Sequence, residues 1–314
     1  MSHMTPSSVT HQQNQKSWRA RLGGGLRARE RQLIFTVVLP AILLYLTFRY
    51  YPVLRTLFLS LTDAQLIKPG YSFVGFANFA ELFGDELFLK TLRNTTIYSA
   101  ATTLIGTALS LALAFILNPL RRGGSLFRFI YFLPSLTSVV AIAAVWKWLY
   151  QPRFGLFNQA LDLLGLPAIG WLNSPQWALP SLIIMALWAG VGYSALIFIA
   201  GLQGIPVMYS EAAVIDGASP LQVALRIKLP LLSRVVSFVL VSGFVGSFQS
   251  FQNAFVMTNG GPLDATRFVA LHIYDYAFQR LQIGQAAAMS FVLLVVVSVF
   301  TVLQLRLQRS DWEL

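Results

Sequence analysis

Six apolar segments, each longer than about 20 residues, dominate this sequence and restrict it to one class of fold. The segments lie at about 32–54, 95–118, 126–150, 178–201, 231–256 and 285–307. The hydrocarbon core of a bilayer is roughly 30 Å thick, so a helix needs about 20 apolar residues to cross it. Lipid offers no partner to backbone polar groups, and the segments lack the alternation typical of barrel strands. The sequence therefore predicts an all-α membrane protein with six transmembrane helices.

The positive charges are unevenly divided between the two sides of the predicted bundle. The chain has 23 Lys and Arg against 12 Asp and Glu, a net charge of +11. A charge of this size is compatible with nucleic-acid binding, but the rule that cytoplasmic loops are positive explains it better. Fourteen of the basic residues fall on the side of the N-terminus and seven on the opposite side. We therefore expect both termini in the cytoplasm, and no nucleic acid as a partner.

The chain ends are expected to lie outside the membrane. Residues 1–30 are basic and rich in Ser, Gln and Gly, which predicts a disordered cytoplasmic N-terminus rather than a cleaved signal peptide. Residues 31–310 would form the six-helix domain, and residues 311–314 a short cytoplasmic tail.

Groups that could carry catalysis or hold a metal ion are sparse. The sequence has no cysteine, three scattered histidines and no Gly-x-x-x-x-Gly-Lys-Ser/Thr loop for ATP. We therefore expect no catalytic residue, no metal site and no cofactor bound by this chain. We interpret His272 as a surface histidine near an outer loop, and Asp264, Arg267 and Asp275 as solvated charges on the same side. The alternative for these three charges is contact with a binding protein.

The inner loop at about 205–230 carries local signals for two short helices. Pro206 suits the start of the first helix and Gly217 suits its end. Ser219, followed by Pro-Leu-Gln, fits a capping box at the start of the second helix, which Pro230 is expected to end. The first helix combines small and apolar side chains, which would let it enter a cleft of another protein. The alternative is an ordinary hairpin that only links two spans.

The residue pattern of this loop is Glu-Ala-Ala, three residues, Gly, nine residues and Ile-x-Leu-Pro. It closely resembles the loop that defines the permease subunits of bacterial ABC importers. The matching residues are Glu211, Ala212, Ala213, Gly217, Ile227, Leu229 and Pro230. In that family the loop holds the coupling helix, which docks into the ATPase subunit. The resemblance implies that these seven residues couple the chain to an ATPase, with Glu211 and Gly217 at the centre.

Three further segments, 74–79, 129–134 and 253–262, are similar to the carbohydrate-uptake group of this family. The group pairs two different permeases, and these segments resemble the first of them, the F subunit of the maltose type. The resemblance covers roughly residues 30–310 and implies the fold of a type I ABC importer permease. It also implies a multi-pass location in the bacterial inner membrane and three partners. These are a second permease, a dimer of cytoplasmic subunits that use the ATP, and an extracytoplasmic solute-binding protein.

Polar residues in the fourth and fifth apolar segments mark a candidate solute pathway, because they are costly in a membrane unless they face the bundle interior. They are Gly190, Tyr193, Gly246, Ser247, Gln249, Ser250 and Asn253. The alternative for the Gly and Ser residues is close helix packing. The resemblance to the maltose-type subunit places solute contacts at Ala186, Gly190, Tyr193, Gly246, Ser247 and Ser250. Of these, Gly190 and Tyr193 keep the residue type of the family.

The function predicted from these features is that of a transmembrane permease subunit of a binding-protein-dependent ABC importer. It would form half of the translocation pathway for a sugar or sugar-like solute and would not be an enzyme. The alternatives are a permease for another polar solute, such as glycerol 3-phosphate, or a secondary transporter. A secondary transporter would need ionisable residues at mid-membrane and inverted repeats, neither of which is visible in the sequence.

Overall fold

A computed structural model of the chain describes residue 33, residues 35–120 and residues 123–307. The predicted disordered N-terminus at 1–30 and the tail at 311–314 lie outside these residues. The chain divides into two compact units, residues 1–58 and 59–314.

The first unit contains all but the last residue of the first apolar span, the helix Phe35–Leu59. Its middle is a π-helical turn, η1 (Leu46–Tyr50), which continues into α2 (Tyr51–Leu59). Arg55 lies over the ring of Phe58 on α2, with 5.4 Å from its guanidinium carbon to the ring centre.

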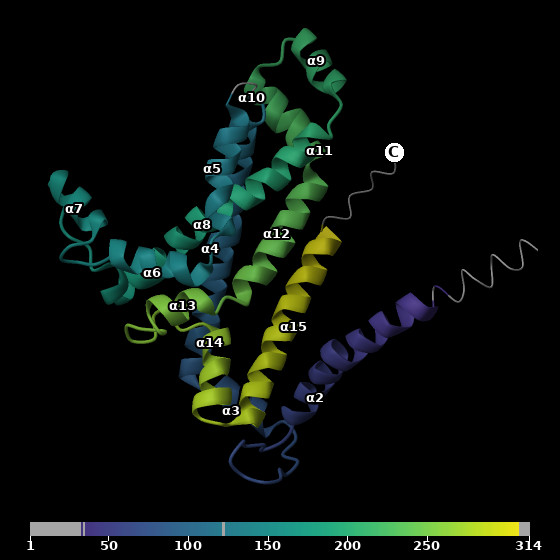
Figure 1. Cartoon of the computed structure of the whole chain (residues 1–314), viewed down its shortest axis with the longest axis vertical. Helices are drawn as coiled ribbons and strands as arrows, with labels where there is room; N and C mark the ends of the chain where they lie inside the picture. Colours follow the sequence, from purple (N-terminus) through teal and green to yellow (C-terminus); the bar gives the residue numbers. More distant parts are fainter. Residues whose placement is uncertain (1–32, 34, 121–122, 308–314) are drawn as a thin grey trace, which may run out of the picture. The chain divides into compact units, whose positions relative to one another are not determined.

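The described part of the second unit contains three unbroken helices that are long and apolar enough to cross a membrane (Figure 1). They are α4 (Glu86–Leu117), α8 (Pro175–Gln203) and α15 (Ile283–Leu307). Both α4 and α8 begin with ordinary start signals: the Asp85 carboxylate accepts a hydrogen bond from the Leu87 amide at 2.8 Å, and Pro175 occupies the first turn of α8. With the helix Phe35–Leu59 and two bent helix pairs, the described residues hold up to six spans, which confirms the predicted fold class.

The shorter helices complete the second unit. They are α3 (Ala77–Gly84), α5 (Gly124–Leu136), α6 (Val139–Leu149), α7 (Leu156–Leu163), η2 (Trp171–Asn173), α9 (Val207–Ile215), α10 (Pro220–Gln222), η3 (Val223–Lys228), α11 (Leu229–Leu231), α12 (Ser233–Phe248), α13 (Gln252–Met257), α14 (Val269–Tyr274) and η4 (Asp275–Gln279).

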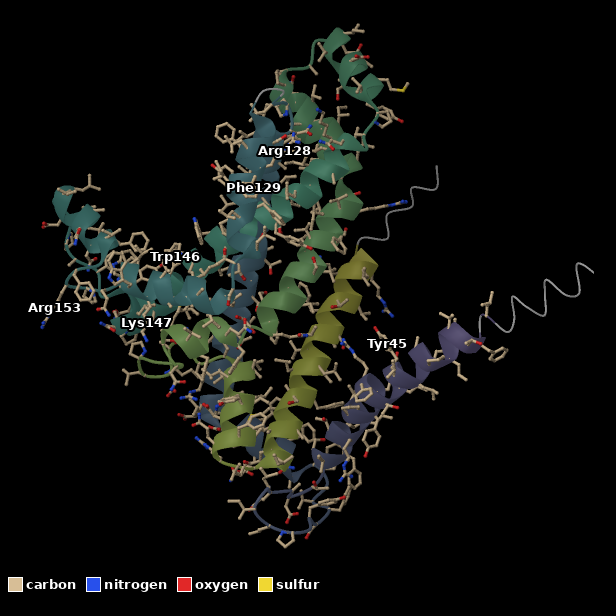
Figure 2. The ribbon with its side chains drawn as sticks, in the orientation of Figure 1. Tyr45, Arg128, Phe129, Trp146, Lys147 and Arg153 are labelled. Carbon is tan, nitrogen blue, oxygen red and sulfur yellow. The ribbon has the colours of Figure 1, made fainter. Side chains whose placement is uncertain are left out.

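The third apolar segment is bent, where the sequence predicted one helix over 126–150. Helices α5 and α6 meet at an angle of 96°. Pro134 lies inside the last turn of α5 and cannot donate to the helix, and the chain leaves the helical conformation at Thr137. Figure 2 shows Arg128 and Phe129 on α5, and Trp146 and Lys147 on the arm beyond the bend.

The fifth apolar segment is also bent, and it is shorter than the predicted 231–256. The helix that begins at Pro220 runs through Pro230 and bends by 70° into α12 after Leu231. This helix ends at Leu231, one residue beyond Pro230, which the sequence predicted to end it. Helix α12 then ends at Phe248, and a new helix, α13, begins at Gln252.

Helix α4 forms the centre of the second unit, packed against both α8 and α12. The Ser110 hydroxyl donates to the Val191 carbonyl of α8 at 3.0 Å, and the Thr103 and Ser247 hydroxyls lie 3.3 Å apart between α4 and α12. Helix α5 also packs against α8. Helices α8 and α12, which carry four of the predicted pathway residues, therefore both pack on α4.

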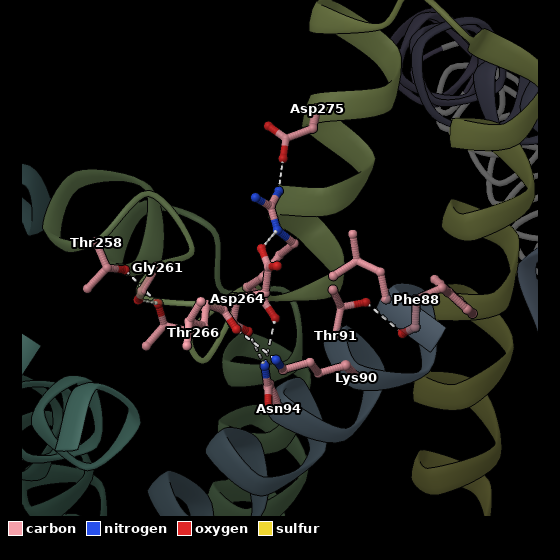
Figure 3. Close-up of polar contacts among 12 residues, drawn as sticks. Phe88, Lys90, Thr91, Asn94, Thr258, Gly261, Asp264, Thr266 and Asp275 are labelled. Atoms are coloured by element: carbon pink, nitrogen blue, oxygen red, sulfur yellow. Dashed lines mark hydrogen bonds and ion pairs between the residues drawn. The ribbon is translucent and has the colours of Figure 1, made fainter. Parts of the chain in front are cut away.

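The charged residues of the loop before α14 are paired within the chain, where the sequence predicted solvated charges (Figure 3). The Arg267 guanidinium contacts the Asp264 carboxylate at 2.6 Å and also pairs with Asp275. The Asn94 amide of α4 donates to the Asp264 carbonyl at 2.8 Å. These contacts fasten the loop to the end of α4.

His272 is fully buried in α14, so its interpretation as a surface histidine was wrong. Its ring lies against Tyr276, and neither ring nitrogen has a hydrogen-bond partner among the described residues. Burial, assisted by the positive charge of Arg267, lowers the pKa of His272 from 6.5 to about 4. No local pattern predicts this burial, because a single histidine in a turn-rich segment is usually exposed.

Burial of His272 predicts a loss of stability in mild acid. The folded chain holds this imidazole neutral, whereas the unfolded chain protonates it below its ordinary pKa. The stabilisation is therefore complete above about pH 6.5 and is lost as the pH falls towards 4, by up to about 3 kcal/mol. Thermal unfolding in detergent at about pH 7.5 and about pH 5 measures the loss.

The matched variant for this prediction is His272→Phe, which keeps a ring of similar size in the same site. It should unfold at nearly the same temperature at both pH values. Equal pH dependence in the variant and the original chain would contradict the assignment to His272, since Asp85, Asp275, Arg267 and Arg280 also act on the site.

Candidate functional site

The loop between α8 and α12 folds as the sequence predicted, into a helix, a glycine turn and a second helix. Pro206 caps α9, and Gly217 follows its end with φ +83°. The Gly217 amide donates to the Val214 carbonyl at 3.0 Å, and the Ala218 amide donates to the Ala213 carbonyl at 2.9 Å. This pair of bonds is the Schellman motif, in which glycine is favoured because its φ is positive.

The second helix of the loop starts with the predicted capping box. The Gln222 amide donates to the Ser219 hydroxyl at 3.3 Å, and the Ser219 amide donates to the Gln222 side-chain oxygen at 2.7 Å. Both short helices are thus defined by contacts between neighbouring residues.

Helix α9 has no buried residue, and all of its residues except the half-buried Ser210 and Ala213 are exposed. Val207 is 68% exposed and Ile215 86% exposed. Figure 1 shows α9 at one end of the second unit, at the opposite end from α3 and α14. An apolar helix in this position presents a surface that can be buried against another protein.

The seven predicted coupling residues lie close together in sequence but differ in exposure. Glu211, Ala212, Gly217 and Pro230 are exposed, whereas Ala213, Ile227 and Leu229 are half-buried. A cavity of about 270 Å³ adjoins the glycine turn. It is lined by Asp216, Gly217, Ala218, Gln222, Arg226 and Ile227.

A first cavity within the bundle, of about 190 Å³, lies between α4, α8 and α12. It contains two of the predicted pathway residues, Gly190 and Ser247, together with Ala186. Most of its remaining polar groups come from α4, which holds none of the predicted pathway residues. The α4 residues are Tyr98, Thr102, Thr103, Gly106, Thr107 and Ser110.

A second cavity, of about 350 Å³, lies beside the bend between α5 and α6. It contains the predicted residues Gly190, Tyr193 and Asn253, again with Ala186. Gly190 and Ala186 line both cavities, so the two spaces share a wall on α8.

Three predicted pathway residues line neither cavity. Gly246 faces open space, Gln249 is exposed, and Ser250 is half-buried in the break between α12 and α13. The missed wall on α4 had a signal in the sequence. Tyr98, Thr102, Gly106 and Ser110 recur every four residues within an apolar segment, which places them on one helix face.

The lining of the two cavities is uncharged, since all of the described residues that form it are apolar, hydroxyl-bearing or amide side chains, or glycines. No group of three or more His, Cys, Asp or Glu that could hold a metal ion occurs in the described part of the chain. The arrangement suits hydrogen bonding to a neutral polar molecule.

A sequence profile of the family described as "Binding-protein-dependent transport system inner membrane component" matches residues 105–310. The chain is 32% identical over 299 residues to the diacetylchitobiose uptake system permease protein NgcF of Streptomyces coelicolor, which covers 89% of this chain and 85% of the relative. It is 34% identical over 275 residues to the sn-glycerol-3-phosphate transport system permease protein UgpA of Yersinia pestis, covering 87% and 93%.

Two crystal structures of bacterial alginate ABC transporters share the fold, each with a TM-score of 0.80. One, in complex with an alginate pentasaccharide-bound periplasmic protein, is 23% identical and covers 90% of this chain and 95% of its own. The other is 24% identical and covers 93% of this chain and all of its own.

Proposed function

From the premise that the chain belongs to the family of binding-protein-dependent transport system inner membrane components, and is an ABC transporter permease rather than an enzyme, we propose that it forms half of the pathway for a neutral sugar. A neutral solute is proposed because the two cavities, which meet at Gly190, are uncharged. Hydroxyl and amide groups can exchange hydrogen bonds with sugar hydroxyls, each of which both donates and accepts.

A phosphorylated solute is the competing candidate, because a relative at 34% identity is named for sn-glycerol 3-phosphate. A phosphate group that leaves water needs cations or several strong donors. The cavities offer no cation among their described lining residues, which favours the neutral solute.

The coupling residues form the second part of the proposal. Helix α9, with Glu211 exposed on it, would dock into a cleft of a cytoplasmic ATPase subunit, one of two that bind and use the ATP. Movement of that subunit would then switch the bundle between outward and inward states. The proposal places α9, both termini and the ATPase in the cytoplasm of a bacterial cell, and α3 and α14 on the outer side.

Two further partners complete the proposed assembly. A second permease would form the other half of the pathway in a heterodimer, and an extracytoplasmic solute-binding protein would deliver the solute. The match to a family that is described as binding-protein-dependent supports this set of partners.

Replacing Tyr193 by alanine tests the pathway. Tyr193 lines the second cavity and is 54% exposed, so the substitution removes an aromatic face from the cavity without opening the core. In the complete transporter reconstituted in vesicles, kcat/KM for ATP-dependent sugar uptake should fall about tenfold, the equivalent of about 1.4 kcal/mol.

The matched control is Tyr131→Ala, which removes the same side chain, 46% exposed, from the neighbouring helix α5 and outside both cavities. Equal effects of the two substitutions would contradict the pathway. Uptake of glycerol 3-phosphate in preference to any neutral sugar would replace the proposed solute with the phosphorylated one.

A further inference from the structure

Tyr98 of α4 lies at the boundary between the two cavities. Its side chain is almost fully buried, at 2% exposure, and it lines the first cavity. Its hydroxyl accepts a hydrogen bond of 2.9 Å from the side-chain amide of Asn253, which lines the second cavity. Gly190 forms part of both walls. The hydrogen-bonded pair of Tyr98 and Asn253 therefore separates two spaces that are otherwise adjacent.

The pair leaves one buried polar atom without a partner. The Asn253 side-chain oxygen is buried and has no hydrogen bond to any described residue. The two ends of an amide are assigned from their contacts, but either assignment gives one end to the Tyr98 hydroxyl and leaves the other unpaired. Such a group is costly where water is excluded, and an unpaired group at a cavity is a position that a ligand can satisfy.

Two other buried hydroxyls, those of Ser110 and Tyr150, differ from that of Tyr98, because their bonds are explained by helix packing. The Ser110 hydroxyl donates to a backbone carbonyl of α8. The Tyr150 hydroxyl donates to the Ser181 carbonyl at 2.9 Å, and Tyr150 is buried to the same 2% exposure as Tyr98. Neither bond involves an incompletely satisfied partner. Of these three hydrogen bonds, only that of Tyr98 lies between the two cavities and has a partner with an unpaired atom.

We propose that the pair of Tyr98 and Asn253 is a gate inside the pathway, which a hydroxyl group of the solute opens by taking the place of the Tyr98 hydroxyl on Asn253. This inference rests on the proposed function. A solute hydroxyl can accept from the amide nitrogen and donate to the amide oxygen, so it satisfies both ends of Asn253, which Tyr98 does not. The released Tyr98 no longer closes the first cavity.

With the gate, α4 joins α8 and α12 in lining the pathway. Tyr98 acts there by closing the passage between the two cavities. Beyond the gate, Thr102, Thr103 and Thr107 supply hydroxyl groups along the first cavity. A neutral, hydroxyl-bearing solute would find partners on each side of the gate. A solute without hydroxyl groups could occupy the second cavity but would not open the passage to the first.

The absence of cysteine from the sequence allows a direct test by thiol labelling. Ser135→Cys places a thiol at the second cavity, and Thr107→Cys places one at the first. The probe is a small, charged methanethiosulfonate reagent that does not cross membranes. It is added to vesicles that contain the complete transporter, without solute or ATP, from the side of α3 and α14. The Ser135→Cys variant should react quickly and the Thr107→Cys variant slowly, because the gate is closed.

Adding Tyr98→Phe to the Thr107→Cys chain should raise its labelling rate about fivefold, the value expected for the loss of one net hydrogen bond. Adding Asn253→Ala should do the same, and the two changes together should not multiply, because they remove the same bond. Tyr150→Phe is the matched control, since it removes an equally buried tyrosine hydroxyl that does not face either cavity, and it should leave the rate unchanged.

Fast labelling of the Thr107→Cys variant with Tyr98 intact would overturn the gate. So would an unchanged rate with Tyr98→Phe, or an equal increase with Tyr150→Phe. The labelling needs neither ATP nor a transported solute, so its outcome is independent of the uptake assay. Normal gating without sugar uptake would count against the proposed function, and sugar uptake without gating would count against the role of Tyr98.

Discussion

Replacing Gly217 by aspartate should abolish solute-stimulated ATP hydrolysis by the complete transporter while the chain remains in the membrane. Gly217 has φ +83°, a conformation that costs a residue with a side chain about 1–2 kcal/mol. A Cβ at this position would meet nothing within 4 Å in the chain itself. The new carboxylate would therefore point into the space that the ATPase subunit is proposed to occupy, and a drop of at least about tenfold in stimulated hydrolysis is expected.

The control for this prediction is Gly70→Asp. Gly70 has φ +87° and also has nothing within 4 Å of a Cβ, so the substitution brings the same strain and the same charge. It lies in the segment between α2 and α3, away from α9. Hydrolysis should be normal in the Gly70→Asp transporter. Normal hydrolysis in the Gly217→Asp transporter, or an equal loss in both, would contradict the docking role of α9.

The α9 turn was predictable because every contact that defines it is local. Pro206, Gly217 and Ser219 act on backbone groups within a few residues of themselves, so their sequence order is enough to place both helices. Apolar length likewise predicts how many spans the chain can form. Length does not predict the path of a span, because a helix of the same composition can run straight or bend.

The bend at α5 and the break after Phe248 depend on what surrounds them. Pro134 alone is compatible with a kinked helix that continues, whereas α6, beyond the 96° bend, packs on α13, which is distant in the sequence. The burial of His272 and the hydrogen bond of Asn94 to Asp264 depend on a loop that folds back onto α4. Contacts between residues far apart in the sequence leave no local pattern to read.

Only part of the candidate pathway was predicted from the sequence. Polar residues in a span are expected to face the interior of the bundle. This argument identified Gly190, Tyr193, Ser247 and Asn253. The same argument applies to Tyr98 and the hydroxyl residues after it on α4, which the predicted pathway does not contain. Only the structure distinguishes a hydroxyl that faces a cavity from one that bonds to its own helix.

Gly190 and Gly192 separate packing from transport, because they lie two residues apart on α8 and differ completely in their surroundings. A Cβ on Gly192 would lie 1.8 Å from the carbonyl oxygen of Tyr131, so the backbones of α5 and α8 are in direct contact there. A Cβ on Gly190 would meet nothing within 4 Å, and Gly190 borders both cavities.

Gly192→Ala should therefore destabilise the chain by about 3 kcal/mol or more, because two helices must move apart to admit one methyl group. Gly190→Ala should leave the unfolding temperature within about 2 °C of the original but lower the rate of sugar uptake, because the methyl group enters the space where the cavities meet. Thermal unfolding in detergent and uptake by vesicles measure the two effects separately. An equal loss of stability in both variants would contradict the cavities at Gly190, and a stable Gly192→Ala chain would contradict the contact between α5 and α8.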